Sequence, residues 1–288
     1  EQEEVMGLFS KDCILPCPFP PGHDEVIYWH KGNNVVHSYY KQKDQLEAQD
    51  PHYRHRTHLF QENIPSGNAS LKLSNLTMTD EGSYMCYVGT AKATTQVKVL
   101  LRVRAPSSYA LEYQKADTER RLKCYAFHTY PAPTISWVQG NISIQETDGE
   151  ETRDGDLYSL RSEQNITNMA DTYYCHIHFH NEVELFKLSV SDQLSNVEGS
   201  STVIPCEHSH NTANTDGFSV VWTLHRDAET SVLASFNGTS HSQQPRVQID
   251  ESDFSLILHD LTADDSGEYL CNISTPPYTK LTVTILRV

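Results

Sequence analysis

The side chains most able to do chemistry gather in one short stretch, "YYCHIHFH" at residues 173–180. It contains Cys175 and three histidines at every second position, His176, His178 and His180, and both residue types are common zinc ligands. A β-strand also points every second side chain to one face, and three imidazoles on one strand span about 13 Å. That span is too long for all three to reach one zinc ion at about 2.1 Å. We therefore expect an exposed strand here, with no metal and no cofactor.

Composition excludes other classes of function. The chain has 22 Lys and Arg against 38 Asp and Glu, a net charge of −16. Such a chain is a poor nucleic-acid binder, and it has no basic run that would hold anionic lipid. No apolar run approaches the roughly 18 residues of a membrane span, and no signal peptide opens the sequence. We expect any such segments to lie outside the printed residues.

Enzyme motifs are also absent from the sequence. There is no glycine-rich phosphate loop, no H-E-x-x-H and no G-x-S-x-G, so we expect no catalytic residues. The acidic stretch "ETDGEETRDGD" (146–156) could suggest calcium, but its place between two expected strands favours a solvated loop. Six N-x-Ser/Thr sequons predict an extracellular glycoprotein. Their asparagines are Asn68, Asn75, Asn141, Asn165, Asn237 and Asn272.

One Cys…Trp…Cys arrangement occurs three times along the chain. The sets are Cys17–Trp29–Cys86, Cys124–Trp137–Cys175 and Cys206–Trp222–Cys271. In an immunoglobulin sandwich a disulfide joins strands B and F, and a strand-C tryptophan packs against it. The tyrosine expected two residues before the second cysteine is present each time, as Tyr84, Tyr173 and Tyr269. The repeat therefore predicts an all-β chain of three tandem immunoglobulin-like sandwiches.

The distance between the paired cysteines indicates the type of each sandwich. Cys17 and Cys86 are 69 residues apart, and Cys206 and Cys271 are 65 apart, which leaves room for the extra strands of a variable-type domain. The 51 residues between Cys124 and Cys175 suit the constant type. We expect a variable-type domain at 1–105, a constant-type domain at 106–190 and a variable-type domain at 191–288.

The repeat also predicts the cysteine pairing. Only the pairs Cys17–Cys86, Cys124–Cys175 and Cys206–Cys271 give each domain one bridge and one tryptophan. Cys13 is then left over as a buried free thiol, with an intermolecular link or a swapped disulfide partner as the alternatives.

A binding surface is the remaining source of function. In variable domains the exposed side of the sheet formed by strands G, F, C and C′ is the usual docking face, and tyrosine is rich in interface energy. Alternation about the inward Trp29 and Cys86 points their sequence neighbours outward. The strand "VVHSYY" adds His37 and Tyr39 or, one residue out of register, Ser38 and Tyr40. The candidate contacts in the expected first domain are Tyr28, His30, His37, Tyr39, Met85, Tyr87, Thr90 and Lys92.

Several phrases resemble the B7/butyrophilin family of immune-regulatory ligands. They include "ILPCPF", "VHSYYKQKDQLEAQDPHYRHRTHLF", "YPAPTISW" and "DFSLILHDLTADDSGEYLCNIS". The resemblance implies a single-pass protein of the cell surface whose first domain binds receptors on T and natural killer cells. The implied partners are a costimulatory transmembrane-and-immunoglobulin-domain receptor and an inhibitory killer-cell immunoglobulin-like receptor.

Three other readings remain. A homophilic adhesion molecule would use the same fold and face. An antibody or T-cell-receptor chain would carry F-G-x-G after the second cysteine, and "TQVKVLLRV" and "KLTVTILRV" do not. A soluble enzyme or metalloprotein is the most distant reading.

Overall fold

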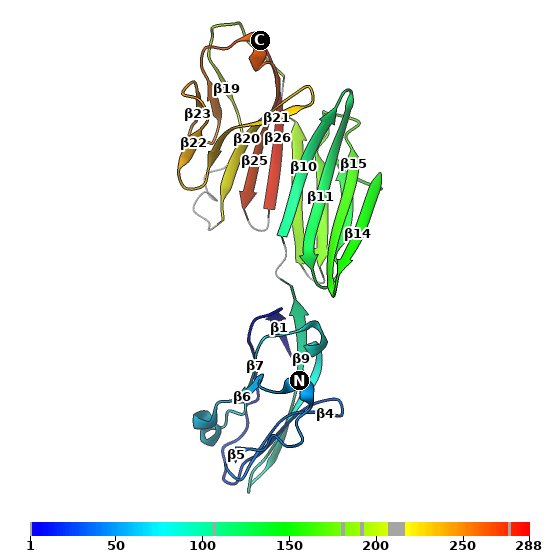
Figure 1. Cartoon of the computed structure of the whole chain (residues 1–288), viewed down its shortest axis with the longest axis vertical. Helices are drawn as coiled ribbons and strands as arrows, with labels where there is room; N and C mark the ends of the chain where they lie inside the picture. The colour runs from blue at the N-terminus through cyan, green and yellow to red at the C-terminus, as the bar shows by residue number, and fades with distance from the viewer. Residues whose placement is uncertain (1, 106–107, 180–181, 191–192, 207–216, 276–277) are drawn as a thin grey trace. The chain divides into compact units, whose positions relative to one another are not determined.

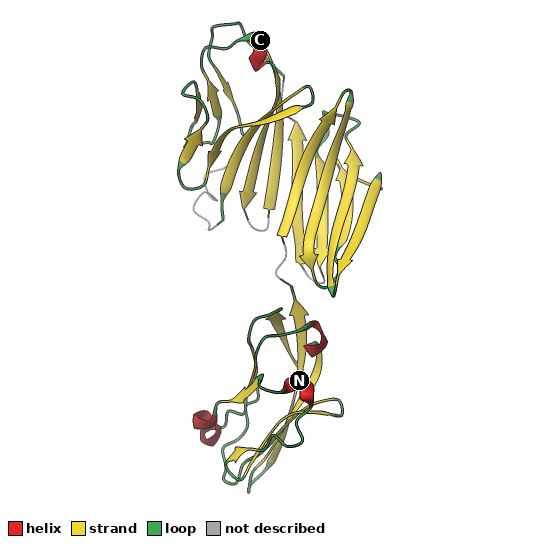
Figure 2. Ribbon diagram, in the orientation of Figure 1, coloured by secondary structure: helices red, strands yellow, loops and turns green. Residues whose placement is uncertain are grey.

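The structure is a computed structural model of the 288-residue chain. It describes residues 2–105, 108–179, 182–190, 193–206, 217–275 and 278–288. Strands joined by loops and a few short helices make up almost all of it (Figure 2). The strands form three immunoglobulin-like sandwiches, each with its own buried core. The chain is therefore an all-β protein, as the repeat predicts.

The first domain has a large front sheet with the strand order β1-β9-β8-β3-β4-β5 (Figure 1). β1 pairs with β9 in parallel, and the other neighbours are antiparallel. The front-sheet strands are β1 (Gln2–Leu8), β3 (Val26–Lys31), β4 (Asn34–Tyr40), β5 (Lys43–Asp44), β8 (Gly82–Gly89) and β9 (Thr94–Arg104).

A smaller back sheet, β2-β7-β6, closes the first domain. Its strands are β2 (Cys13–Leu15), β6 (Thr57–Leu59) and β7 (Leu71–Leu73), with the short helices η1 (Pro51–Tyr53), η2 (Gln61–Ser66) and η3 (Met78–Asp80) in the connections. Leu15, Leu71 and Leu73 are fully buried because the strand alternation turns them toward the front sheet.

The middle domain consists of two four-stranded layers. One is the sheet β10-β11-β15-β14, and the other follows the order β13-β12-β16-β17. The strands are β10 (Ser108–Ala116), β11 (Glu119–Thr129), β12 (Thr134–Gln139), β13 (Ile142–Ile144), β14 (Asp148–Asp154), β15 (Leu157–Asn165), β16 (Tyr173–Phe179) and β17 (Glu182–Val190). β14 contains most of the acidic stretch 146–156 and is exposed along its length. The expectation of a loop there is wrong, because the stretch pairs with β15 as an edge strand.

The third domain repeats the variable-type plan. Its front layer is β26-β25-β20-β21-β22, with β18 paired to β26, and its back layer is β19-β24-β23. The strands are β18 (Leu194–Ser195), β19 (Thr202–Ile204), β20 (Ser219–Arg226), β21 (Glu229–Phe236), β22 (Ser240–Ser242), β23 (Val247–Ile249), β24 (Leu256–Leu258), β25 (Gly267–Thr275) and β26 (Tyr278–Arg287). A short helix, η5 (Ala263–Asp265), precedes β25.

The middle and third domains share one continuous sheet. β17 of the middle domain pairs in parallel with β26 of the third, with Leu188 opposite Leu281. Leu270, Leu281 and Val283 of the third domain are buried in the same cluster as the core of the middle domain. The two domains therefore form one packed body.

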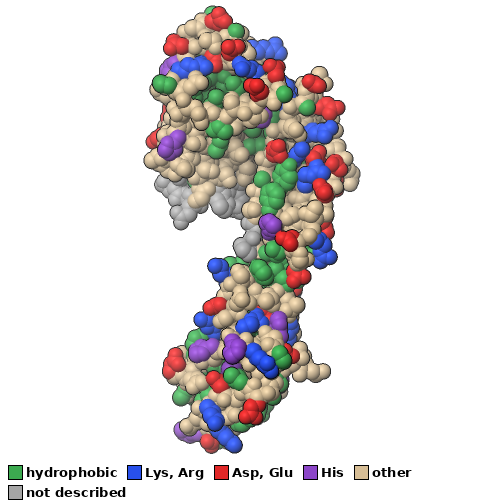
Figure 3. Space-filling view, viewed as in Figure 1, with side chains coloured by type: hydrophobic (Ala, Val, Ile, Leu, Met, Phe, Trp, Pro, Cys, Tyr) green, Lys and Arg blue, Asp and Glu red, His purple; other side chains and the backbone are tan. Residues whose placement is uncertain are grey.

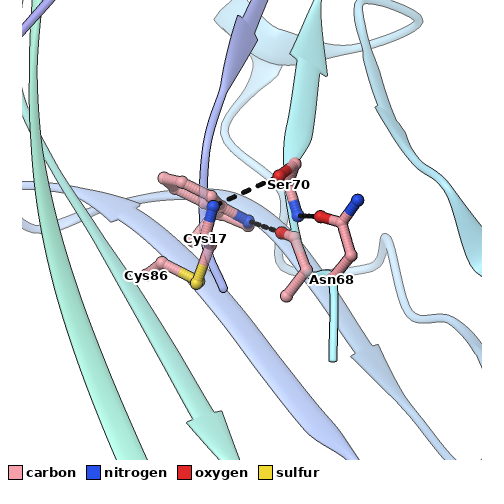
Figure 4. Close-up of a disulfide and its surroundings, with 6 residues drawn as sticks. Cys17, Asn68, Ser70 and Cys86 are labelled. Carbon is pink, nitrogen blue, oxygen red and sulfur yellow. Dashed lines mark hydrogen bonds between the residues drawn. A yellow bond between two sulfur atoms is a disulfide. The ribbon is translucent and has the colours of Figure 1, made fainter. Parts of the chain in front are cut away.

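Each sandwich contains the disulfide and the tryptophan that the repeat predicts. The bridges Cys17–Cys86, Cys124–Cys175 and Cys206–Cys271 are all present, and Cys13 is free and buried. In the first domain the Cys17 N–H donates to Ser70 Oγ at 3.2 Å, beside the bridge to Cys86 (Figure 4). The three tryptophans are at most 1% exposed, so each bridge lies inside a packed core.

Candidate functional site: the front sheet of the first domain

Four aromatic side chains meet on the outer surface of the front sheet. Tyr28 lies at the centre, with ring centroids 6.0 Å from His30, 6.2 Å from Tyr40 and 6.4 Å from Tyr87. All four side chains are half-buried. We call this group the tyrosine cluster. Its rings present apolar area to the solvent together with polar atoms that can hydrogen-bond, which is the composition of an interface core.

Strand alternation explains why three of these side chains lie together. Trp29 and Cys86 are opposite each other on β3 and β8, and both are fully buried. Their sequence neighbours must point the other way. Tyr28 is paired with Tyr87 in this register, so the inward disulfide and tryptophan place the two outward tyrosines side by side.

The structure corrects the expected positions of His37 and Tyr39. Both lie in the interior, at 1% and 6% exposure. The pairing of β3 with β4 has a bulge: Trp29 is opposite His37, but His30 is opposite Val35. The extra residue reverses the alternation on β4. The other register is the one that forms: Tyr40 is half-buried on the outer side, and Ser38, opposite Tyr28 on the same side, is only 5% exposed.

His37 serves the interior of the domain instead. Its ring nitrogens lie 2.8 Å from Thr57 Oγ1 and 2.8 Å from Asp44 Oδ1. The Gln49 amide donates to the same Thr57 hydroxyl at 2.8 Å. These contacts join β4 and β5 to β6 of the back sheet, so His37 holds the edge of the front sheet in place.

The remaining candidates border the tyrosine cluster. Met85 is half-buried on β8, opposite His30. Thr90 opens the turn between β8 and β9, and its Oγ1 accepts from the N–H of Lys92 at 3.3 Å and of Ala93 at 3.2 Å. Thr90 therefore shapes the turn, while Lys92 is exposed near its tip.

A hollow lies at the end of the cluster. It is lined by Tyr28 and Tyr40 together with Asp24, Glu25, Val26, Lys41 and Gln42. Burial raises the pKa of the neighbouring Tyr39 hydroxyl, and the negative charges of Glu25 and Asp44 raise it further. Lys41 and Gln42 both have positive φ and form the two-residue turn between β4 and β5. The hollow thus offers carboxylates and one lysine beside two aromatic rings.

Both sequons of the first domain lie away from this face. Asn68 precedes β7, and its Oδ1 accepts from the Ser70 N–H at 2.9 Å (Figure 4). Asn75 follows β7 and is exposed. Both belong to the side of the back sheet, so sugar at either asparagine would leave the tyrosine cluster uncovered.

The corresponding face of the third domain is covered along β25 and β26. Leu270 on β25 points out of its own sandwich, yet it is only 7% exposed because it packs into the core cluster of the middle domain. Tyr113 of β10 donates to Glu268 Oε2 at 2.6 Å, and Arg120 of β11 donates to Glu268 Oε1. The middle domain therefore covers the β25 and β26 side of this face, and no such cover is described over the tyrosine cluster of the first domain.

The histidine strand lies on the outer surface of the middle domain. The rings of His176 and His178 stack with centroids 5.9 Å apart, and His178 Nε2 lies 2.9 Å from Ser136 Oγ. Burial lowers the pKa of His176, and the neighbouring His178 lowers it further. His180 falls outside the described residues. Within the described ranges no three His, Cys, Asp or Glu side chains come close enough to hold a metal ion.

On the side displayed in Figure 3, acidic and basic side chains are interspersed. In the part of the chain that the structure describes, no helix is long and apolar enough to cross a bilayer.

Comparison with known proteins agrees with this fold. The immunoglobulin V-set domain model matches residues 1–104 and 189–288. Human HERV-H LTR-associating protein 2 is 37% identical over the whole chain, which spans 72% of that relative. Human V-set domain-containing T-cell activation inhibitor 1 is 35% identical over 46% of the chain and 49% of its own length.

Among solved structures, the crystal structure of bovine butyrophilin superposes with a TM-score of 0.54 at 19% identity. It covers 66% of this chain and 96% of that one. This likeness shows the fold alone. The family assignment rests on the sequence match that covers the whole of this chain. V-set proteins and these relatives are non-enzymatic and act outside the cell or at its surface. The chain is therefore a member of the B7/butyrophilin family of the immunoglobulin superfamily.

Proposed function

We propose that this protein is a cell-surface immune-regulatory ligand and that its first domain binds a receptor on T or natural killer cells through the tyrosine cluster. The observation that carries the proposal is the position of Tyr28, within 6.4 Å of three other aromatic rings on an open sheet face. Clustered tyrosines of this kind are typical of the residues that contribute most to protein interfaces.

Two features restrict docking to this face. Asn68 and Asn75 direct sugar to the back sheet of the first domain, and the middle domain covers the β25 and β26 side of the third domain's front face. Asn141, Asn165 and Asn237 are exposed elsewhere and are further expected carriers of glycans. The front sheet of the first domain is then the aromatic surface best placed to meet a receptor.

The family supplies the class of partner. Membership favours a receptor of the immunoglobulin superfamily, and the two candidates are a transmembrane-and-immunoglobulin-domain receptor and a killer-cell immunoglobulin-like receptor. Attachment to the cell through one membrane-spanning segment beyond the printed residues completes the proposal.

The test is a binding screen of the glycosylated chain against a panel of leukocyte receptors that includes both candidates. Each binder is then measured with Tyr28→Ala and Tyr87→Ala, and with Tyr125→Ala as the matched control. Tyr125 is a half-buried tyrosine of the middle domain, stacked on Phe127 at 5.4 Å. We expect each front-sheet substitution to weaken binding about 30-fold, or about 2 kcal/mol, and the control to bind like the parent.

Two results would contradict the proposal. If the front-sheet variants bind every positive receptor as tightly as the parent does, the tyrosine cluster is not the receptor-binding site. Self-association of the chain at micromolar concentration without binding to any receptor would favour homophilic adhesion instead.

A further inference from the structure

One sequon lies within the interface that joins the middle and third domains. Asn272, Ile273 and Ser274 form an N-x-Ser sequon on β25. Cys271 and Ile273 face the core of the third domain, so Asn272 points out of the front sheet. It shares that face with Leu270, which the middle domain covers.

The surroundings of Asn272 are unusual for an acceptor asparagine. Asn272 is opposite Leu281 on β26, and Leu281 is fully buried in the cluster that holds the middle-domain core. The Asn272 Oδ1 atom is buried and has no hydrogen-bond partner within the described residues. A buried unpaired carbonyl oxygen costs free energy, so the closed arrangement gains nothing from this side chain.

The other sequon of the third domain gives a contrast. Asn237 is exposed in the turn between β21 and β22, outside the buried cluster. A sugar attached to Asn237 would project into solvent. A sugar attached to Asn272 must extend over the sheet face on which Leu270 packs against the middle domain.

We propose that the Asn272 sequon is a modification site that decides whether the third domain closes onto the middle domain. A chain with a bare Asn272 closes, with β17 paired to β26 and Tyr113 bonded to Glu268. A chain with sugar at Asn272 stays open, and its third-domain front sheet is then available to other partners.

The modification is ordinary N-glycosylation from a lipid-diphosphate oligosaccharide donor. The bond between the sugar C1 and the diphosphate oxygen breaks, and the lipid diphosphate leaves with the electron pair. The bond between C1 and Asn272 Nδ2 forms, and the amide nitrogen loses one proton.

A chemical adduct tests the proposal whatever the natural sugar occupancy is. The full chain with Asn272→Cys is joined to a maleimide polymer of about 2 kDa, in mild denaturant if the closed form does not react, and is then returned to buffer. Asn237→Cys with the same adduct is the matched control, and each unreacted variant controls for the new thiol. The readout is hydrogen exchange of the β10 and β26 backbone.

We expect the Asn272→Cys adduct to speed exchange in β10 and β26 at least about tenfold, while the Asn237→Cys adduct changes neither strand. In the protein from a glycosylating host, molecules with sugar at Asn272 should show the same fast exchange. Equal, slow exchange for both adducts would overturn the proposal, as would sugar at Asn272 on molecules whose β26 stays protected. Neither result bears on receptor binding by the first domain.

Discussion

Arg246 and Asp265 of the third domain form a bidentate ion pair next to the start of β25. Arg246 Nη1 donates to Asp265 Oδ2 at 2.9 Å, and Nη2 donates to Oδ1 at 2.7 Å. The first domain repeats this contact with Arg56 and Asp80. In each domain a tyrosine hydroxyl donates to the backbone carbonyl of the paired aspartate. In the first domain the Tyr84 hydroxyl lies 2.6 Å from that carbonyl oxygen.

This geometry predicts how stability depends on pH. Burial alone would raise the pKa of Asp265, but hydrogen bonds from Arg246 and from the Thr262 N–H outweigh it, so the pKa is lowered. The carboxylate therefore contributes stability above the unfolded pKa of about 3.9, and this contribution is lost as the pH falls through the folded value.

Asp265→Asn should destabilise the protein by about 2 kcal/mol at pH 7, because it removes the charge from hydrogen bonds to a buried group. The gap between parent and variant should shrink as the pH falls below about 4, because Asp265 of the unfolded parent takes up a proton there while the folded carboxylate, with its lowered pKa, is still charged. Calorimetry at pH 7, 4 and 3 measures this gap. A gap of constant size would show that the charge of Asp265 does not matter.

Tyr39 and Tyr40 are neighbours with opposite roles. Tyr39 is 6% exposed in the first-domain core, whereas Tyr40 is half-buried on the outer face. Tyr39→Ala should cost about 3 kcal/mol of stability by leaving a cavity. Tyr40→Ala should cost little stability and should weaken receptor binding. Thermal unfolding and receptor titration of both variants separate the two effects, and a reversed pattern would contradict the observed register of β4.

Cys13 should behave as a structural thiol. It is 8% exposed, and burial raises the pKa of its thiol above the ordinary value. Because the thiolate is the reactive form, the native protein should react slowly with a thiol reagent and should react fully after unfolding. Fast labelling of the native chain at pH 8, or a dimer that a reducing agent separates, would show that Cys13 is accessible.

Glu268 should hold the junction between the middle and third domains. Arg120 and Lys115 both pair with its Oε1, at 3.3 Å for Lys115, and Tyr113 donates to Oε2. Glu268→Ala leaves two partly buried cations without this carboxylate and should cost about 3 kcal/mol. Calorimetry should then show separate transitions for the two domains. One unchanged joint transition would mean that the apolar contacts alone hold the junction.

The repeat of cysteine and tryptophan was enough to predict the fold and the three disulfides, because each bridge requires fixed strands around it. Tyr28, His30, Met85 and Tyr87 were also predictable, since each is the immediate sequence neighbour of the inward Trp29 or Cys86. His37 and Tyr39 were not, because a bulge opposite Trp29 and His30 has no signal in residue types and reverses the alternation on β4. The packing of Leu270 against the middle domain was equally unpredictable, since contacts between domains leave no periodic pattern in the sequence.

A sugar placed on the front sheet tests the central claim most directly. Gln96→Asn with Lys98→Thr creates a sequon on β9, where Gln96 is opposite Tyr87 and both substituted residues are exposed. Lys72→Asn creates the matched sequon on β7 of the back sheet, followed by Leu73 and Ser74. Once mass spectrometry has confirmed both sugars, receptor binding should vanish for the front-sheet variant and persist for the back-sheet variant. Undiminished binding with the front-sheet sugar in place would contradict the account.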